Sequence, residues 1–427
     1  MKGRIPFFII ALFLLSLILR LLYAFWYHTP PLGDGVEYHR LALSLLGGKG
    51  YVNENGVPIS TYPPFHPFLL FLSYFFFGVH AGPVRWIQAG ISALTVVWIY
   101  HLGVLSRGEP EGRCSGVVSA CYIPLITYAS AFWSLSENLF LFLLSWAVLV
   151  LYRLSKEPSF QRTLGCGVLF GLAAQVRAVG FLIPGMACGW LLWEGRRTGK
   201  PLFRWAVLLL LFFCVTITPW TVRNYLVHRA WIPIATDGSQ VFWLGNHPSE
   251  KGFGFGNPEA ANKISGRASE VEASRLFVEE NLRFIRENPG EVARLSLFKF
   301  LWFWYPFDGD THRLGSRYNY CYGVVFSLAL LGVWYSRKRW KEDLFFYLFA
   351  LYFFAGAMVT YGQPRFRLPI EPLLIIMGSW GILGLKDRWG ARNAKLTVFG
   401  LAGAHLLLGV FSESLRVLGK QLLGGSF

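Results

Sequence analysis

The sequence predicts an all-α protein that crosses a membrane many times, and its composition and hydropathy carry this prediction. Of 427 residues, 54% are hydrophobic and 15% are charged, whereas about a quarter of the residues in soluble proteins are charged. Apolar stretches near the roughly 20 residues that a membrane helix needs recur from end to end. A polytopic membrane protein is therefore expected rather than a soluble domain.

The distribution of basic residues predicts how these stretches are oriented. The net charge is +16, and the basic residues cluster in short loops between apolar runs rather than among stacking aromatic residues. This positive-inside pattern predicts that the loops face the cytoplasm, and it gives no indication of a nucleic-acid partner. The four clusters are Arg153, Lys156 and Arg162; Arg196, Arg197, Lys200 and Arg204; Arg337, Lys338, Arg339 and Lys341; and Lys386, Arg388, Arg392 and Lys395.

The first apolar stretch, residues 5–27, follows Lys2 and Arg4 and is predicted to run outward. It is too long for a signal peptide and ends in bulky aromatic residues rather than at a small-residue cleavage site, so we interpret it as a retained helix. The basic loops that follow predict roughly 11 to 13 membrane helices, with residues 28–63 and 220–317 on the outer side.

The next stretches are less regular. Arg107 and Arg113 indicate a cytoplasmic loop, so residues 85–105 and 115–134 are predicted to cross the membrane as a pair. Residues 64–80 are then expected to lie in the outer interface or to re-enter it, which the three prolines around their start allow.

Three parts are expected along the chain: an N-terminal membrane module at 1–220 with its first outer loop at 28–63, an outer loop region at 221–317, and C-terminal membrane helices at 318–427. Within the outer region, "GNHPSEKGFGFGNPE" is typical of a loop. The following segment predicts a helix that ends at Asn288, directly before Pro-Gly.

The stretch "PLGDGVEYHRLALSLLGGKGY" places two acids, Asp34 and Glu37, just after the first apolar run. Asp34 is expected to cap a short helix with Glu37 at its third position, as a variant of the capping box. Apolar residues at helical spacing follow, and Gly47–Gly48 mark the stop, so the helix is predicted to lie on the outer membrane surface. A carboxylate at a helix N-terminus also stays ionised and can serve as a general base towards a hydroxyl. The two interpretations are compatible.

Further segments form an ordered set with this one. They are "YPPFHPFLLFLSYFFFG", "RWIQAGISALTVVWIYHLG", "SENLFLFLL", "QVRAVGFLIPG", "TPWTVRNYLVHRAWIPIATDGSQVFWLGNHPSEKGFG" and "PRFRLPIEPLLIIMGSWGI". In this order, over roughly residues 5–390, the chain resembles GT-C glycosyltransferases. It is most similar to their bacterial branch of protein O-mannosyltransferase-like and aminoarabinose transferase-like proteins.

The resemblance implies a GT-C-type bundle with amphipathic helices on its outer face. It also implies an enzyme that moves a hexosyl or pentosyl group from a polyprenyl-phosphate carrier to a lipid, glycan or protein hydroxyl. The reaction would take place in the cell envelope, at the outer face of the bacterial inner membrane. The family's catalytic base matches Asp34, and direct displacement would invert the anomeric carbon.

The resemblance also matches Glu137 to a second acidic position, which would orient the acceptor or hold a metal. A helix-start carboxylate after Ser136 is the structural alternative. Glu37 is a further candidate, or only a cap. The family varies in metal dependence. The sequence has no His/Cys cluster that would settle this point, so the requirement for a divalent metal is left open.

Four arginines at the predicted outer boundary are candidates for binding the carrier phosphate: Arg177, Arg223, Arg365 and Arg367. A guanidinium suits phosphate because its planar donors bind oxygens in pairs and its charge is permanent. Arg177 interrupts an apolar stretch, where a lone charge is costly unless it faces water or an anion; snorkelling at an outer turn is the alternative. The aminoarabinose transferase has a phosphate-binding lysine where this chain has Tyr62, which moves that role to the arginines.

Other polar residues are candidates for contacts with the substrates. His66 follows the Pro-Pro pair and is either a hydrogen-bond donor to substrate or structural. Asn246, His247 and Lys251 lie in "GNHPSEKGFG", which is either a recognition loop over the cavity or an ordinary turn.

A transporter or flippase of lipid-linked glycans is the chief alternative function, since it too would have many helices and charges at membrane depth. The sequence shows no internal repeat, and its unusual acids gather at the outer boundary, which favours an enzyme. An inactive scaffold and an O-antigen ligase-type enzyme are further alternatives. The six cysteines show no CxxC spacing and predict neither a metal knuckle nor a disulfide framework.

Overall fold

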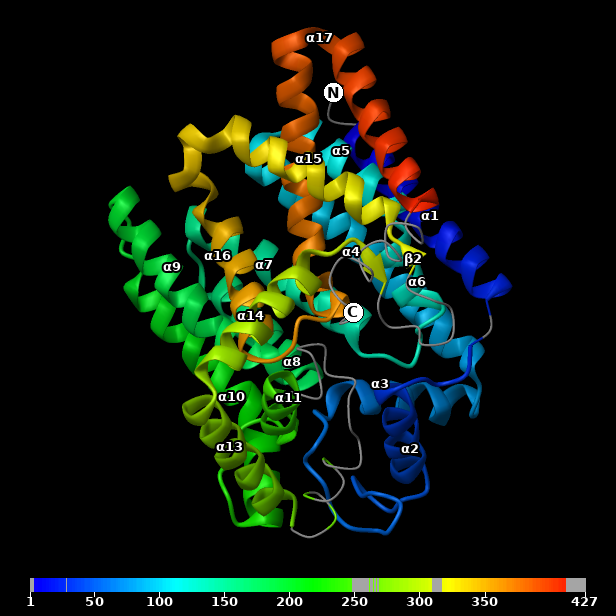
Figure 1. The fold of residues 1–427 in the computed structure, drawn as a ribbon, viewed down its shortest axis with the longest axis vertical. Coiled ribbons are helices and arrows are strands. Elements are labelled where there is room, and N and C mark those ends of the chain that lie inside the picture. The colour runs from blue at the N-terminus through cyan, green and yellow to red at the C-terminus, as the bar shows by residue number, and fades with distance from the viewer. Residues whose placement is uncertain are drawn as a thin grey trace. The chain divides into compact units, whose positions relative to one another are not determined.

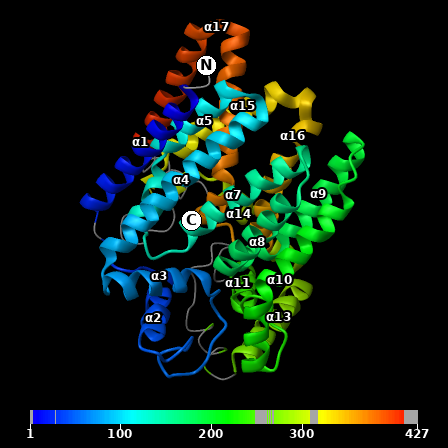
Figure 2. The same cartoon turned by 180° about the vertical axis from the view of Figure 1, so that it is seen from behind.

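The computed structural model describes residues 4–27, 29–247, 261, 264, 266, 269–308 and 317–411, and these residues are almost entirely helical (Figures 1 and 2). They form two compact units that interleave along the chain. The first comprises residues 1–98, 125–296 and 359–361, and the second comprises residues 99–124, 297–358 and 362–427. This division follows packing rather than membrane depth, so the expected parts 1–220, 221–317 and 318–427 stay predictions.

The helices of the first unit come mainly from the first two thirds of the chain. They are α1 (Arg4–Trp26), α2 (Asp34–Leu46), α3 (Phe65–Phe77), most of α4 (Ala81–Arg107) and of α6 (Ile123–Ser130), α7 (Glu137–Lys156), α8 (Phe160–Val176), the 3-10 helix η1 (Ala178–Leu182), α9 (Ile183–Thr198), α10 (Phe203–His228), α11 (Asp237–Asn246), α13 (Glu270–Glu287) and the start of α14 (Pro289–Trp304).

The second unit contains fewer elements. They are α5 (Glu109–Cys121), the two-residue strands β1 (Phe307–Asp308) and β2 (Arg317–Tyr318), α15 (Tyr320–Ser336), η3 (Arg337–Arg339), most of α16 (Trp340–Val359), η4 (Pro364–Ile370) and α17 (Glu371–Val410). The strands pair antiparallel, with Phe307 opposite Tyr318.

Small residues allow the closest helix crossings. In the first unit, a Cβ added to Gly167 of α8 would lie 2.6 Å from Phe212 Cβ of α10, and one added to Gly171 would lie 2.6 Å from Thr216 Cβ. Glycines four positions apart, facing a neighbouring helix, let two backbones approach in the way that membrane helices favour. In the second unit, Gly332 of α15 has the backbone of α17 against its Cα in the same manner.

Seven helical stretches among the described residues are long and apolar enough to cross a membrane. They are Phe7–Trp26, Ala81–Arg107, Glu137–Lys156, Ala178–Thr198, Phe203–His228, Tyr320–Val359 and Pro364–Val410. The last two have 40 and 47 residues, about twice what one crossing requires. Each contains a break, at η3 in the first and at Gly390 (φ 80°) in the second. The all-α polytopic class is confirmed, while the number of 11 to 13 crossings stays a prediction.

Two expectations about single segments are corrected. The predicted crossing at 115–134 is broken at Tyr122, whose backbone is extended, into α5 and α6. Pro124 explains the break, because it lacks the N–H that would continue the helix. The outer region expected from residue 220 begins inside a helix, because α10 continues to His228 with Pro219 within it. α3 has 13 residues, and the expectation that residues 64–80 do not cross stays a prediction, whereas the helix end at Asn288 is confirmed.

Candidate functional site

Asp34 is the first residue of α2, and its local geometry differs from the predicted cap. The N-cap residue before the helix is Gly33, with φ 52°, which has no side chain to accept a capping hydrogen bond. The capping-box prediction is therefore wrong: a left-handed glycine makes the entry turn, which most other residues would resist. Glu37 lies on the exposed side of α2 and pairs with Arg40 at 2.8 Å.

The helix is held against the segment that precedes α7. Gly35 lies directly against Ser134, so that an added Cβ would overlap the hydroxyl and lie 2.8 Å from Ser134 Cβ. One turn later, the buried Tyr38 has its hydroxyl 3.4 Å from Ser136 Oγ. Burial, and next the charge of Asp34, raise the pKa of Tyr38 well above its usual range, so its hydroxyl stays protonated. These contacts seat the first turn of α2 against residues 134–136, directly before α7.

His66, a candidate for substrate contact, is fully buried at the first turn of α3. Its Nε2–H donates to the Ser134 carbonyl at 2.8 Å, and its ring meets Tyr38 edge-on at 5.1 Å. Burial lowers the pKa of His66 to about 4, so the ring is neutral at physiological pH. This geometry gives His66 a structural role: it holds the segment against which α2, the helix that begins with Asp34, packs.

Glu137 and Arg177 form a buried ion pair of 2.6 Å beside this segment. Glu137 is the first residue of α7, and Arg177 follows α8 in extended conformation (φ −144°, ψ 125°), where the helix stops. Arg177 also donates to Ser136 Oγ at 3.2 Å. The charges of Asp34, Arg177 and Glu137 all act on the Tyr38 hydroxyl, so the fold gathers three residues that the sequence analysis singled out separately.

Asp237 is a member of this group that the sequence analysis missed. It is the first residue of α11, and its Oδ1 is shielded from solvent and accepts no hydrogen bond from the residues described. Burial, followed by the charge of Asp34, raises the pKa of Asp237 to about 7, while Arg177 opposes the shift. The sequence does show an acidic residue, Asp237, between "IPIAT" and "GSQ". No local pattern, however, relates this residue to Asp34.

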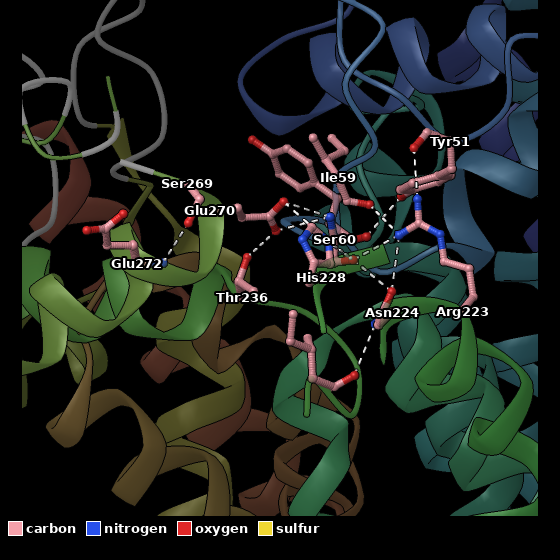
Figure 3. A network of polar contacts seen from close by, with 12 residues as sticks. Tyr51, Ile59, Ser60, Arg223, Asn224, His228, Thr236, Ser269, Glu270 and Glu272 are labelled. Carbon is pink, nitrogen blue, oxygen red and sulfur yellow. Dashed lines mark hydrogen bonds and ion pairs between the residues drawn. The ribbon is translucent and has the colours of Figure 1, made fainter. Parts of the chain in front are cut away.

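Arg223 of α10 has a different environment, shown in Figure 3. Its guanidinium donates to the carbonyls of Tyr51 and Ile59 at 3.0 and 2.7 Å, and to Ser60 Oγ at 2.9 Å. The neighbouring Asn224 accepts from the Ser60 hydroxyl at 2.7 Å. Arg223 thus anchors the loop between α2 and α3, and its contact with a phosphate stays a prediction.

Glu270, the first residue of α13, completes this anchor (Figure 3). Both of its carboxylate oxygens accept the Ser60 amide N–H, each at 3.0 Å. The Thr236 hydroxyl also donates to Glu270, and the Thr236 amide donates to the Ser60 carbonyl at 3.1 Å. The network therefore fixes the residue directly before Asp237.

The two arginines of "PRFRLP" lie in the second unit and differ from one another. Arg367 is fully buried, pairs with Glu371 at 3.1 Å and donates to the Tyr305 carbonyl at 2.6 Å. Its guanidinium also stacks 3.4 Å from the centre of the Tyr322 ring. Arg365 is only half-buried and lies over the ring of Phe366. Of the two, Arg365 is the better placed to meet a ligand.

The remaining candidates lie at the end of α11. Asn246 is buried and donates to the carbonyls of Phe242 and Val359 at 2.8 and 3.1 Å. His247 packs on Trp243 with ring centroids 4.5 Å apart. Lys251 lies outside the described residues. Within the part of the chain that the structure covers, no three His, Cys, Asp or Glu side chains are arranged to hold a metal ion.

Comparisons with known proteins support this architecture. Residues 61–221 match the family model of dolichyl-phosphate-mannose-protein mannosyltransferase. No curated protein matches the sequence. The fold is similar to the archaeal oligosaccharyltransferase AglB from Archaeoglobus fulgidus in complex with an inhibitory peptide and a dolichol-phosphate. That comparison has a TM-score of 0.58 and 14% identity, and it covers 94% of this chain and 53% of the other.

Two further structures agree. ArnT from Cupriavidus metallidurans bound to undecaprenyl phosphate matches with TM-score 0.57 and 13% identity, over 94% of this chain and 63% of that one. The Archaeoglobus fulgidus oligosaccharyltransferase in complex with Zn and sulfate matches with TM-score 0.59 and 14% identity, over 93% and 52%. The chain thus spans between about half and two thirds of the length of these proteins. The GT-C-type fold and the resemblance to mannosyltransferase-like membrane proteins are confirmed.

Proposed function

We propose that this chain is an integral-membrane glycosyltransferase that moves a sugar from a polyprenyl-phosphate-linked donor to a hydroxyl acceptor. The acceptor is a lipid, a glycan or a protein, and the reaction takes place at the outer face of the membrane. One observation carries the proposal: Asp34 begins α2 beside the Glu137–Arg177 pair, within a fold of the GT-C type. The solved structures bound to dolichol-phosphate and to undecaprenyl phosphate support a lipid-phosphate donor.

In the proposed reaction, Asp34 acts as the general base. The acceptor hydroxyl gives its proton to the Asp34 carboxylate as its oxygen bonds to the anomeric carbon. The bond between that carbon and the phosphate oxygen breaks, and the electron pair leaves with the phosphate. Because attack and departure occur on opposite faces of the sugar, the anomeric configuration inverts.

The leaving phosphate requires positive charge at the membrane boundary. Arg177 is nearly buried and pairs with Glu137 at 2.6 Å, so its guanidinium is held in a fixed position, although the pair as a whole carries no net charge. Arg365 of the second unit is a separate candidate for contact with a lipid phosphate, and its guanidinium is half-buried. A planar guanidinium stabilises the charge that develops on the phosphate as the bond breaks.

The proposal is tested with the full chain in lipid nanodiscs, using radiolabelled polyprenyl-phosphate sugars and a panel of hydroxyl acceptors. We expect Asp34→Asn to lower the transfer rate by about 100-fold or more, as for loss of a general base. Asp387→Asn, an exposed aspartate in a basic segment of α17, is the matched control and should transfer at the wild-type rate. Wild-type turnover by Asp34→Asn would remove Asp34 from this role.

The same preparation separates an enzyme from a transporter. In sealed vesicles, an enzyme releases polyprenyl phosphate and glycosylated acceptor whether or not a proton gradient is present. Movement of an intact lipid-linked sugar across the bilayer, driven by the gradient and without cleavage of the sugar–phosphate bond, would instead indicate a flippase.

The proposed outer position of the site is tested by labelling. A cysteine introduced at the exposed Asn55 should react with a membrane-impermeant reagent added from the outside.

A further inference from the structure

We propose that the basic ends of α7, α9 and α10 form a binding site for the headgroup of an anionic phospholipid. The structure brings together two basic clusters that lie apart in the sequence, at the end of the first unit that is predicted to face the cytoplasm. This combined set is called the basic cluster below, and its members are Arg153, Lys156, Arg196, Arg197, Lys200 and Arg204. The inference goes beyond the proposed glycosyl transfer and does not depend on it.

Three apolar stretches long enough to cross a membrane have one end at the basic cluster. α7 ends at Lys156, α9 ends at Thr198, and α10 begins at Phe203. Lys200 joins these ends, because its Nζ donates to the Lys156 carbonyl at 2.7 Å. The Lys200 carbonyl also packs on α9, where a Cβ added to Gly195 would lie 2.9 Å from its oxygen. The cluster is therefore fixed at the level where the apolar spans end, which is where the headgroups of a bilayer lie.

A buried carboxylate holds two of the cations in place. Glu194 of α9 has a side chain that is only 3% exposed, and its two oxygens accept from Arg197 Nη2 and Nε, each at 2.8 Å. Lys156 Nζ lies 3.4 Å from the same carboxylate. A guanidinium bound through two parallel hydrogen bonds has a fixed plane. Both cations still reach the surface, with side chains that are 30% and 47% exposed, so one acid fixes two accessible positive charges at one place.

The cluster carries a strongly positive charge. Its six basic residues are accompanied by one acid, Glu194, which leaves a net charge of +5. The adjacent Glu157 is paired with Arg162 at 2.7 Å, and that pair adds no net charge. Three cations of the cluster are exposed and have no ion-pair partner among the described residues: Arg153, Arg196 and Arg204. Like charges concentrated in this way repel one another, and a bound anion relieves the repulsion.

The neighbouring aromatic residues favour a lipid as the source of that anion. Phe203 is 68% exposed, and the Arg204 guanidinium lies 4.6 Å from the centre of the Trp205 ring. The Arg197 guanidinium lies 5.6 Å from the centre of the Trp193 ring in the same manner. Tryptophan is typical of the membrane–water interface, and basic pockets between membrane helices on the cytoplasmic side bind anionic headgroups. The apolar rings would then meet the acyl chains, while the cations bind the phosphate.

Lipid binding to the full chain in detergent tests this inference. Native mass spectrometry should show phosphatidylglycerol bound about tenfold or more tightly than phosphatidylcholine, whose headgroup has no net charge. The triple variant Arg153→Gln, Arg196→Gln and Arg204→Gln should lose this preference. The matched control, Lys386→Gln, Arg388→Gln and Arg392→Gln in α17, removes the same charge from three exposed residues and should bind as the wild type does. Equal binding of the two lipids by the wild type, or equal losses in the two triple variants, would overturn the inference.

Glu194→Gln separates a built site from a diffuse positive charge. This variant makes the cluster more positive, so attraction by charge alone would strengthen the binding of phosphatidylglycerol. If Glu194 fixes Lys156 and Arg197 for the headgroup, binding should instead fall about several-fold. Unchanged or tighter binding would overturn the site.

Thermal unfolding of the wild type in detergent gives a measurement that needs no variant. Phosphatidylglycerol should raise the melting temperature, because a ligand that binds only the folded chain stabilises it. Inorganic phosphate at the same concentration should leave the melting temperature unchanged. An equal rise with inorganic phosphate would assign the cluster to a soluble anion and overturn the lipid assignment.

Discussion

The guanidinium of Arg177 lies 2.6 Å from the carboxylate of Glu137, and the two side chains are 15% and 5% exposed. One residue ends α8 and the other begins α7, and both face the Ser134–Ser136 segment on which α2 rests. A buried pair of this kind costs desolvation free energy, so its value lies in geometry rather than in net stability. It holds a neutralised cation beside Asp34.

Breaking the Glu137–Arg177 pair by removing one charge should therefore lower the stability of the fold. Glu137→Gln leaves the Arg177 charge buried and uncompensated, and we expect the free energy of unfolding to fall by about 3–5 kcal/mol. Thermal unfolding in nanodiscs measures this change. The double variant Glu137→Leu with Arg177→Met should recover most of the stability but not the transfer rate. Full transfer by the double variant would show that the pair is dispensable for the reaction.

Gly35 should tolerate no side chain. In Gly35→Ala the new methyl group would overlap Ser134, so α2 must shift, at a cost typical of overpacking, about 1–3 kcal/mol. Because Asp34 moves with the helix, the transfer rate should also fall, and by more than the loss of folded protein explains. Gly82→Ala in α4, where an added Cβ meets nothing within 4 Å, is the control. Equal stability and transfer in the two variants would contradict the close seating of α2.

His66 should make stability fall in acid. Its pKa in the folded chain, about 4, lies below the ordinary value of 6.5, so the unfolded chain binds the proton more readily. The stabilising contribution is complete above about pH 6.5 and is lost as the pH falls towards 4, by about 3 kcal/mol in total. Unfolding measured between pH 7 and 4 should show this slope. His66→Gln should remove it, and an identical slope in that variant would assign the effect to other groups.

The loop between α2 and α3 should loosen when its carboxylate anchor, Glu270, is removed. Glu270→Gln weakens the two acceptors of the Ser60 amide, and bonds to a charged group contribute about 1.5–3 kcal/mol each. Hydrogen exchange of peptides over residues 51–60 should accelerate by roughly tenfold or more. Glu279→Gln, which alters an exposed pair with Arg275 on the same helix, should leave this exchange unchanged. Unaltered protection in Glu270→Gln would show that Arg223 alone holds the loop.

Substitutions of the two arginines, Arg365 and Arg367, should have different effects on activity and stability. Arg365→Gln is expected to raise the KM for the lipid-linked donor roughly tenfold with little change in thermal stability, as for loss of one charge-assisted bond. Arg367→Gln should instead destabilise the fold, because Glu371 is left buried without its cation. A stable Arg367→Gln protein with a raised donor KM would move the phosphate contact to Arg367.

Local sequence patterns predicted much of the framework. The low charged fraction and the recurrent apolar runs predicted the all-helical membrane class, since a lipid environment selects helices that satisfy their own hydrogen bonds. The stops at Gly47–Gly48 and Asn288 were also predicted, because turn residues end helices through their own backbone preferences. The break at Tyr122 was missed, although Pro124 marks it in the sequence.

The candidate site was predicted only in part. Asp34, Glu137 and Arg177 were singled out as charges at the ends of apolar runs, a local signal for the membrane boundary. Their meeting at Tyr38, the burial of His66 and the anchoring by Arg223 depend on partners far away in the sequence. Composition and periodicity thus determined which segments are helices in a bilayer, because burial of apolar faces is a local property of the chain. Only the tertiary structure decided that Asp237 begins a helix with one carboxylate oxygen shielded from solvent, because a carboxyl's environment is set by whichever remote helices surround it.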